Sequence, residues 1–162
     1  MERANHGGEK VTDEIRFTVY GIAKPAGSKR GLLHPHTKRV MVIDAGGKDS
    51  REWKSEVKDA ARAAYSGPPL EGPLELIVDI YRPRLKSHLT KNGVPKVSAP
   101  MWCATRPDAT KLLRGIEDAL TNAGLWRDDA QVAFQIVRKS YDEPPRVEVS
   151  IRRLDPQPAS DT

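Results

Sequence analysis

Five stretches of the chain have the apolar and polar spacing of β-strands. In residues 74–81 every second side chain is apolar, and these side chains share one face because successive strand residues point to opposite sides. They are Leu74, Leu76, Val78 and Ile80. The other four stretches are residues 15–22, 39–44, 132–140 and 146–152. The pattern predicts a small sheet, in which residues 39–44 pair with residues 15–22 across an exposed basic loop at residues 24–31.

Two further stretches repeat apolar residues at helical spacing. In residues 49–65 the apolar stripe consists of Trp53, Val57, Ala60, Ala61 and Ala64. In the helix that begins near Asp108 it consists of Leu112, Leu113, Ile116, Ala119, Leu120 and Ala123. Asp49 and Glu52 resemble a capping box, and Gly124 is expected in the left-handed conformation that ends a helix. Together the elements predict an α/β (α+β) fold with a small mixed sheet and two main helices.

The length of 162 residues accommodates one compact domain with a core. We expect this domain to span residues 14–154, between flexible tails at residues 1–13 and 155–162. Residues 82–105 show no periodicity and contain several Pro and Gly residues. Because loops of this length are usually functional or disordered, we predict a flexible basic loop that becomes ordered on nucleic acid.

The positive charge is concentrated in two tracts. The net charge is +5, and there is no Asp or Glu in residues 15–43 or in residues 82–107. Lys and Arg residues gain affinity for nucleic acids by displacing counterions from phosphates, so the tracts favour a polyanionic partner. A solvated basic surface without a partner explains the composition equally well.

Other features restrict the class of protein. Cys103 is the only cysteine, which excludes an intramolecular disulfide and favours the reducing cytoplasm. No apolar run is long enough for a membrane span, so no membrane partner is expected. The Gly residues match no P-loop pattern, so no nucleotide cofactor is expected either.

Charged residues of both signs gather between residues 106 and 141. We expect Asp108 and the pair Asp128 and Asp129 to lie toward the same end of one helix–strand unit. The basic residues around them are Arg106, Lys111, Arg114 and Arg127. Carboxylates in such a setting indicate a site for a divalent metal and a phosphate. The simpler alternative is that Asp108 caps the helix and that the Asp pair belongs to a turn.

The same residues carry a resemblance to a known family. Asp108 near a helix start is followed by Asp118-Ala119-Leu120, Ala123-Gly124-Leu125-Trp126 and Asp128-Asp129-Ala130-Gln131-Val132. This series resembles the RusA family of Holliday-junction resolvases. The resemblance implies a homodimeric, Mg²⁺-dependent endodeoxyribonuclease, with Mn²⁺ as a possible substitute, that resolves four-way junctions or other branched DNA by paired nicks.

The resemblance also implies roles for individual residues. Asp108 matches the first acid of the family's Asp-x-Asp pair, Asp129 matches its last metal-binding acid, and Arg114 stands where the family has a Lys. The second acid of the pair falls on Thr110, which is a departure from the family pattern. Thr110 would still offer a hydroxyl ligand, and Asp128 or Asp79 would supply the missing charge. The implied catalytic residues are therefore Asp108, Asp129 and Arg114, and the implied metal ligands are Asp108, Asp129, Asp128 and Thr110.

Basic residues of both tracts and of the central segment are the candidates for DNA contacts. They are Lys24, Lys29, Arg30, Arg82, Arg84, Lys86, Arg106, Lys111 and Arg127. Two other functions stay open. Thr110 favours a junction-binding protein that has kept the fold and lost the chemistry, and the basic loops alone would suit an RNA-binding or assembly protein.

Overall fold

The main sheet contains four strands in the order β1-β6-β4-β5. The computed structural model describes residues 14–27, 29–44 and 46–154. Within them the strands are β1 (Ile15–Tyr20), β4 (Leu74–Arg82), β5 (Val132–Tyr141) and β6 (Arg146–Arg153). β4 runs parallel to β5 and antiparallel to β6, and β6 runs antiparallel to β1. The predicted small mixed sheet is confirmed.

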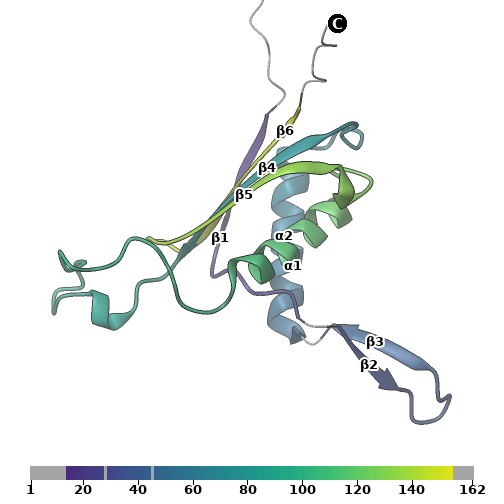
Figure 1. Ribbon diagram of the computed structural model, residues 1–162, viewed down its shortest axis with the longest axis horizontal. Helices are drawn as coiled ribbons and strands as arrows, with labels where there is room; N and C mark the ends of the chain where they lie inside the picture. Colours follow the sequence, from purple (N-terminus) through teal and green to yellow (C-terminus); the bar gives the residue numbers. More distant parts are fainter. Residues whose placement is uncertain (1–13, 28, 45, 155–162) are drawn as a thin grey trace, which may run out of the picture.

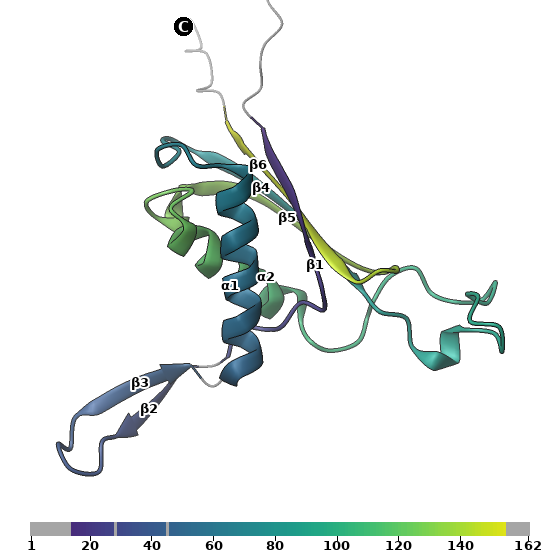
Figure 2. The same ribbon diagram turned by 180° about the vertical axis from the view of Figure 1, so that it is seen from behind.

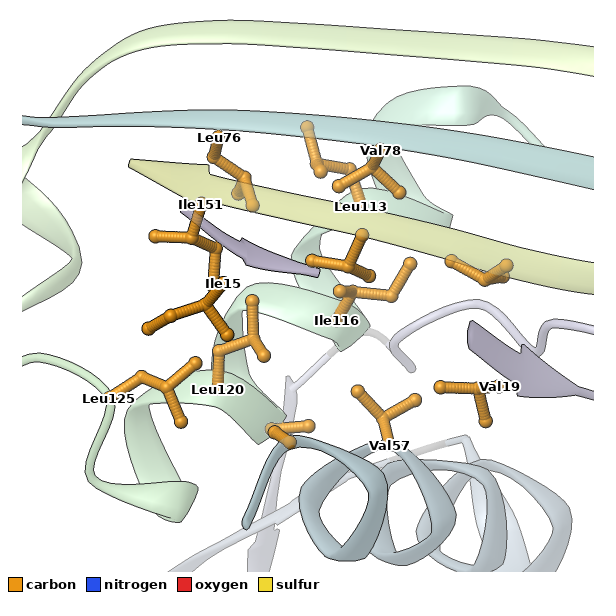
Figure 3. Close-up of a cluster of buried hydrophobic side chains, with 14 of the residues drawn as sticks. Ile15, Val19, Val57, Leu76, Val78, Leu113, Ile116, Leu120, Leu125 and Ile151 are labelled. Carbon is orange, nitrogen blue, oxygen red and sulfur yellow. The ribbon is translucent and has the colours of Figure 1, made fainter. Parts of the chain in front are cut away.

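Both long helices, α1 (Gly47–Ala64) and α2 (Ala109–Ala123), cover the same face of this sheet (Figures 1 and 2). Their apolar stripes meet the inward side chains of β4 and β6, as the close-up in Figure 3 shows. Fully buried members of this core include Val57, Leu76, Val78, Ile116, Leu120 and Ile151. The predicted α/β class is therefore confirmed. Neither of these helices is both long enough and apolar enough to cross a membrane, and no other described helix is.

The ends of the helices test two predictions about helix capping. α1 begins at Gly47, and its N-cap residue Gly46 makes no side-chain cap hydrogen bond. The predicted capping box at Asp49 and Glu52 is therefore wrong; Asp49 lies in the first turn, where a carboxylate is favoured by the helix dipole. Gly124 ends α2 with φ of 78°, as predicted, because glycine adopts this left-handed conformation without a steric cost.

A separate two-stranded hairpin projects from the domain (Figure 1). It pairs β2 (Lys29–Leu33) with β3 (Val40–Asp44) in antiparallel register. The prediction of an exposed loop through residue 31, and of pairing between residues 39–44 and β1, is therefore wrong. The local pattern could not indicate the partner, because β2 is short and is not buried against the core. The large apolar side chains that the hairpin exposes are Leu32, Leu33, Val40, Met41 and Val42.

The long segment between β4 and α2 projects on the side opposite to the hairpin (Figures 1 and 2). It contains one short 3-10 turn, η1 (Lys86–His88), and internal backbone hydrogen bonds such as Lys96 N–H to the His88 carbonyl at 2.9 Å. Its flexibility and its ordering on nucleic acid stay predictions. The predicted tails at residues 1–13 and 155–162 lie outside the described residues.

The connection from β4 through α2 to β5 determines where the two ends of α2 lie. β4 and β5 are parallel, so the chain that leaves the end of β4 must return to the start of β5. α2 makes this return, and its 15 residues span roughly 22 Å. The N-terminus of α2 therefore lies at the end of the sheet where β4 and β5 finish, and its C-terminus lies where β5 begins.

Burial of Leu120 predicts its contribution to stability. Its side chain is fully buried between α2 and the sheet, whereas Leu33 in the hairpin is 67% exposed. Leu120→Ala should lower the free energy of unfolding by about 2–5 kcal/mol, because it removes apolar contacts and leaves a cavity. The matched control, Leu33→Ala, should change it by less than about 0.5 kcal/mol. Urea unfolding followed by circular dichroism measures both; an equally large loss at Leu33 would contradict the exposed placement of the hairpin.

Candidate active site

Asp108 occupies the N-cap position of α2, but its side chain does not cap the helix. Its backbone is extended, with φ of −64° and ψ of 139°, and the carboxylate makes no cap hydrogen bond. The side chain is exposed, and its nearest ionic partner is the Lys111 ammonium at 3.7 Å. An exposed pair of this kind contributes little to stability. The capping alternative therefore does not account for the carboxylate, which is accessible to a ligand.

Four polar residues continue this site around the start of α2. Thr110 lies in the first turn, and Lys111 and Arg114 follow on the exposed side of the helix. Arg106, two residues before Asp108, is also exposed. The N-terminal half of α2 and the residues just before it therefore present one carboxylate, one hydroxyl and three cations to solvent.

The basic segment after β1 is fixed beside the same half of α2. The Ala26 backbone N–H donates to the Lys111 carbonyl oxygen at 3.0 Å. A Cβ built at Gly115 would lie 3.5 Å from both Ala26 N and the Lys24 carbonyl oxygen, which is an ordinary van der Waals distance and shows that the two segments are in contact. Lys24 thereby lies near the site, although its ammonium is also 3.9 Å from Asp49.

Lys139 holds the chain that leads into Asp108. Its ammonium donates to the carbonyl oxygens of Thr105 at 2.6 Å and Pro107 at 2.7 Å. The sequence analysis gave Lys139 no role. Its position on a strand that follows the acidic pair was the only indication in the sequence. The carbonyl groups that its ammonium contacts lie more than 30 residues away along the chain.

Asp128 and Asp129 differ in what their side chains do. Asp128 accepts from the Ala130 N–H at 2.8 Å and caps η2 (Asp129–Gln131). Gln131 completes a capping box by accepting from the Asp128 N–H at 3.3 Å, and its amide donates to the Leu70 carbonyl at 2.9 Å. The Asp-x-x-Gln spacing could have indicated this box. Asp128 is therefore engaged in local structure, whereas Asp129 is exposed and has no such role.

The exposed Asp129 borders a shallow hollow near the end of α2. The hollow has a volume of about 390 Å³ and is lined by Lys54, Asp118, Thr121, Asn122, Arg127, Asp128 and Asp129. Lys54 donates to Asp118 at 3.1 Å. Close by, burial raises the pKa of Glu117 above its ordinary value of 4.5; the Gln135 amide opposes this shift, and the charges of Asp129 and Asp118 add to it.

The structure separates the two predicted acidic groups. Asp108 precedes α2 at the end of β4 and β5, and Asp129 follows α2 near the start of β5. The expectation that they lie toward the same end is wrong. A helix that connects two parallel strands runs back along them, from the end of the sheet where the strands finish to the end where they begin. In the part of the chain that is described, no three His, Cys, Asp or Glu side chains come close enough together to hold a metal ion.

Several other candidates have defined positions. Asp79 lies on the sheet face away from the helices and accepts from the Arg138 guanidinium at 2.7 Å, so it cannot supply charge at α2. Arg82 donates to the Ala23 carbonyl at 2.7 Å, and Arg84 to the Pro100 carbonyl at 2.9 Å. Lys86 and Arg127 are exposed. Lys29 and Arg30 lie in β2, and their side chains are outside the described parts.

The profile of the family described as "Endodeoxyribonuclease RusA" matches residues 23–152, which include β4, α2 and β5 in full. The chain belongs to the RusA family. A relative from Bacillus subtilis (strain 168), the uncharacterized protein YqaN, is 33% identical over 144 residues, which cover 88% of this chain and 98% of YqaN. The crossover junction endodeoxyribonuclease RusA of Lactococcus phage r1t is 30% identical over 53 residues, 33% of this chain and 40% of the phage protein. The match places residues 23–152 in a RusA family domain, in keeping with the resemblance carried by the segment after Asp108.

The charge of Asp129 contributes to the raised pKa of Glu117, which gives a testable prediction for this RusA family chain. A folded pKa above the ordinary value means that the folded protein favours protonated Glu117, so this group lowers the free energy of unfolding as the pH rises from about 4.5 through the folded pKa. Asp129→Asn should lower the pKa of Glu117, but not fully, because burial persists. NMR titration of the Glu117 carboxyl carbon measures the change.

Asp128→Asn is the matched control for this titration. Asn retains the capping hydrogen bond, and Asp128 is not a source of the Glu117 shift. The pKa of Glu117 in this variant should therefore equal its pKa in the unaltered protein. A shift with Asp128→Asn and none with Asp129→Asn would contradict the placement of the two carboxylates.

Proposed function

We propose that this chain is a metal-dependent endodeoxyribonuclease that cuts branched DNA, such as four-way junctions, by paired nicks. The observation that carries the proposal is Asp108, an exposed carboxylate that does not cap its helix and lies among Arg106, Lys111 and Arg114 in a RusA family chain. Basic side chains attract the DNA backbone, and a carboxylate among them attracts a hard cation.

We further propose that two copies of the chain complete the metal site. Asp108 and Asp129 lie at opposite ends of α2, so one chain cannot place both on one ion. In a twofold-symmetric homodimer with antiparallel α2 helices, Asp108 and Thr110 of one protomer would meet Asp129 of the partner subunit. The symmetry would generate two identical sites, one for each strand to be cut. A bound Mg²⁺ or Mn²⁺ would polarise the scissile phosphate and activate water.

The charge order along α2 supports this arrangement. Lys111 and Arg114 are in its N-terminal half, and Glu117 and Asp118 follow toward the C-terminus. The first turn has no acidic residue and the last turn has no basic residue, so the order does not serve the helix dipole. Two such helices in antiparallel orientation would instead bring the basic half of each near the acidic half of the other, where Glu117 and Asp118 also accept from Gln135 and Lys54 of their own chain.

The remaining residues have separate roles in the proposal. Arg114 binds the scissile phosphate through two N–H groups and stabilises the added negative charge, but its high pKa prevents it from accepting a proton. Lys24, Arg106 and Lys111 bind neighbouring phosphates. Lys139 is a positioning residue, because it holds the Thr105 and Pro107 carbonyls that precede Asp108.

Thr110 supports a second candidate function. A threonine hydroxyl attracts a cation less strongly than a carboxylate does, so a protein that binds junctions without cutting them would have the same fold and the same basic surface. Metal-independent binding of a four-way junction, together with no cleavage in Mg²⁺ or Mn²⁺, would favour this function over the nuclease.

Complementation between two inactive variants tests the nuclease and its shared site. The protein should nick a synthetic four-way junction in Mg²⁺, and Asp108→Asn or Asp129→Asn alone should reduce the rate by about 100-fold or more, as loss of an electrostatic catalytic group does. Mixing the two variants should restore nicking, because a heterodimer contains one site with both native carboxylates. Gel electrophoresis of labelled strands measures the rate.

The outcomes of this test are separable. No cleavage by the native chain would contradict the nuclease function. If the native chain cuts but the mixture does not, only the shared site is contradicted. A site built within one chain would contain an altered carboxylate in every protomer of the mixture, so every dimer would be inactive. Asp128→Asn is the control, and it should retain most activity since Asn keeps the η2 cap.

Thr110→Asp should strengthen the site. A carboxylate in the first turn is compatible with the helix dipole, and it adds one ligand charge beside Asp108. The dissociation constant for Mn²⁺ should fall roughly tenfold, since affinity for hard cations rises with ligand charge. Titration calorimetry measures it, with Thr110→Asn as the neutral control of the same size. Equal Mn²⁺ affinities for the Asp and Asn variants would remove Thr110 from the metal site.

A further inference from the structure

The segment between β4 and α2 returns to the sheet along the edge of β5. There the Tyr141 N–H donates to the Met101 carbonyl at 2.8 Å, and the Cys103 N–H donates to the Lys139 carbonyl at 3.1 Å. These bonds place Trp102 opposite Ser140 in an antiparallel bridge. The backbone of Trp102 is therefore held as an extra strand position beside β5.

The Trp102 side chain is nevertheless open to solvent. It is 56% exposed, whereas Trp53 is 3% and Trp126 is 1% exposed. Its neighbour Met101 is 60% exposed. A large aromatic ring on a fixed backbone gains free energy when a flat partner covers it, and it loses little conformational entropy in doing so.

A hollow of about 490 Å³ adjoins the ring, on the sheet face away from the helices. Its lining residues are Asp79, Tyr81, Met101, Trp102, Arg138, Ser140, Tyr141 and Asp142. The volume is within the range of pockets that hold small molecules. The site therefore combines an aromatic surface with polar groups at its border.

The charges in this hollow are already paired. Arg138 donates to Asp79 at 2.7 Å, and Arg146 donates to Asp142 at 3.0 Å. The Arg146 guanidinium also lies 3.9 Å from the centre of the Tyr81 ring and covers one of its faces. A phosphate would have to compete with these carboxylates, whereas an uncharged heteroaromatic ring would meet both donors and acceptors. The hollow therefore suits a nucleobase better than a phosphate.

The same segment links the hollow to the candidate active site. Lys139 accepts from the Cys103 N–H through its carbonyl and donates to the Pro107 carbonyl through its ammonium at 2.7 Å, so one residue positions both Trp102 and the chain that leads into Asp108. From residue 83 to residue 107 there is no acidic residue. DNA bound along this segment would bring bases near Trp102.

We propose that Trp102 and its hollow bind an unstacked nucleobase of the DNA, next to the strand that is cut. The proposal rests on the proposed nuclease function. Base stacking on an aromatic ring tolerates any base, so the site would respond to an unpaired base at a branch point rather than to sequence.

Fluorescence without a divalent metal tests this site, because Trp102 is the exposed tryptophan and the other two are buried. The probes are a four-way junction with one unpaired 2-aminopurine at the branch, the fully paired junction, and a linear duplex. The unpaired junction should quench tryptophan emission in the native protein. Trp102→Ala should abolish the quenching and weaken binding of this junction about tenfold, while binding of the duplex stays unchanged.

Trp102→Phe should retain most of the affinity, because a phenyl ring still stacks. Val97→Ala, at an exposed apolar position of the same segment that does not line the hollow, should bind all probes as the native protein does. Equal affinity of the native and Trp102→Ala proteins for the unpaired junction would overturn the proposal. So would an equal loss for the duplex, or a changed oligomeric state in size-exclusion chromatography, which would indicate a protein interface. Failure of the native protein to bind any junction would instead contradict the proposed function.

Discussion

The packing of α2 against β4 and β6 is the contact on which the rest of the structure depends. The helix buries Leu112, Ile116 and Leu120 completely, and this stripe runs along most of its length. Because β4 and β5 are parallel, the helix must run back from the end of the sheet where these strands finish to the end where they begin. The same packing that forms the core therefore sets the distance between Asp108 and Asp129.

The polar residues around α2 divide into those that hold the chain and those that face solvent. Asp128, Gln131 and Lys139 satisfy backbone groups in the segments that enter and leave the site. Asp108 and Asp129 have no such structural hydrogen bonds and are exposed. A carboxylate that caps a turn contributes to local stability, whereas an exposed carboxylate that makes no cap and only an exposed ion pair contributes little. This contrast supports the functional role that is proposed for Asp108 and Asp129.

Two projections extend from opposite sides of the domain, and they differ in how they are held. The β2–β3 hairpin exposes aliphatic side chains, and in the described chain its two strands pair only with each other. The segment at residues 83–105 is joined to the edge of β5 by backbone hydrogen bonds and by Arg84, which donates to the Tyr141 carbonyl at 3.4 Å. An isolated hairpin is marginally stable in water, so a bound partner would stabilise the β2–β3 hairpin. The segment at residues 83–105 is already held against β5.

The sequence by itself determined the elements whose pattern is local. The strand at residues 74–81, the stripe of α2 and the glycine that ends it were predictable, because side-chain periodicity and backbone stereochemistry act within a few residues. The family was recognisable for a similar reason, since its motif lies in one continuous segment. Only the tertiary structure decided that β3 pairs with β2, that Asp79 is engaged by Arg138, and that the two acidic groups lie apart. Each of these depends on contacts between segments distant in the chain, and the direction in which a helix crosses a sheet is set by strand pairing that no local pattern encodes.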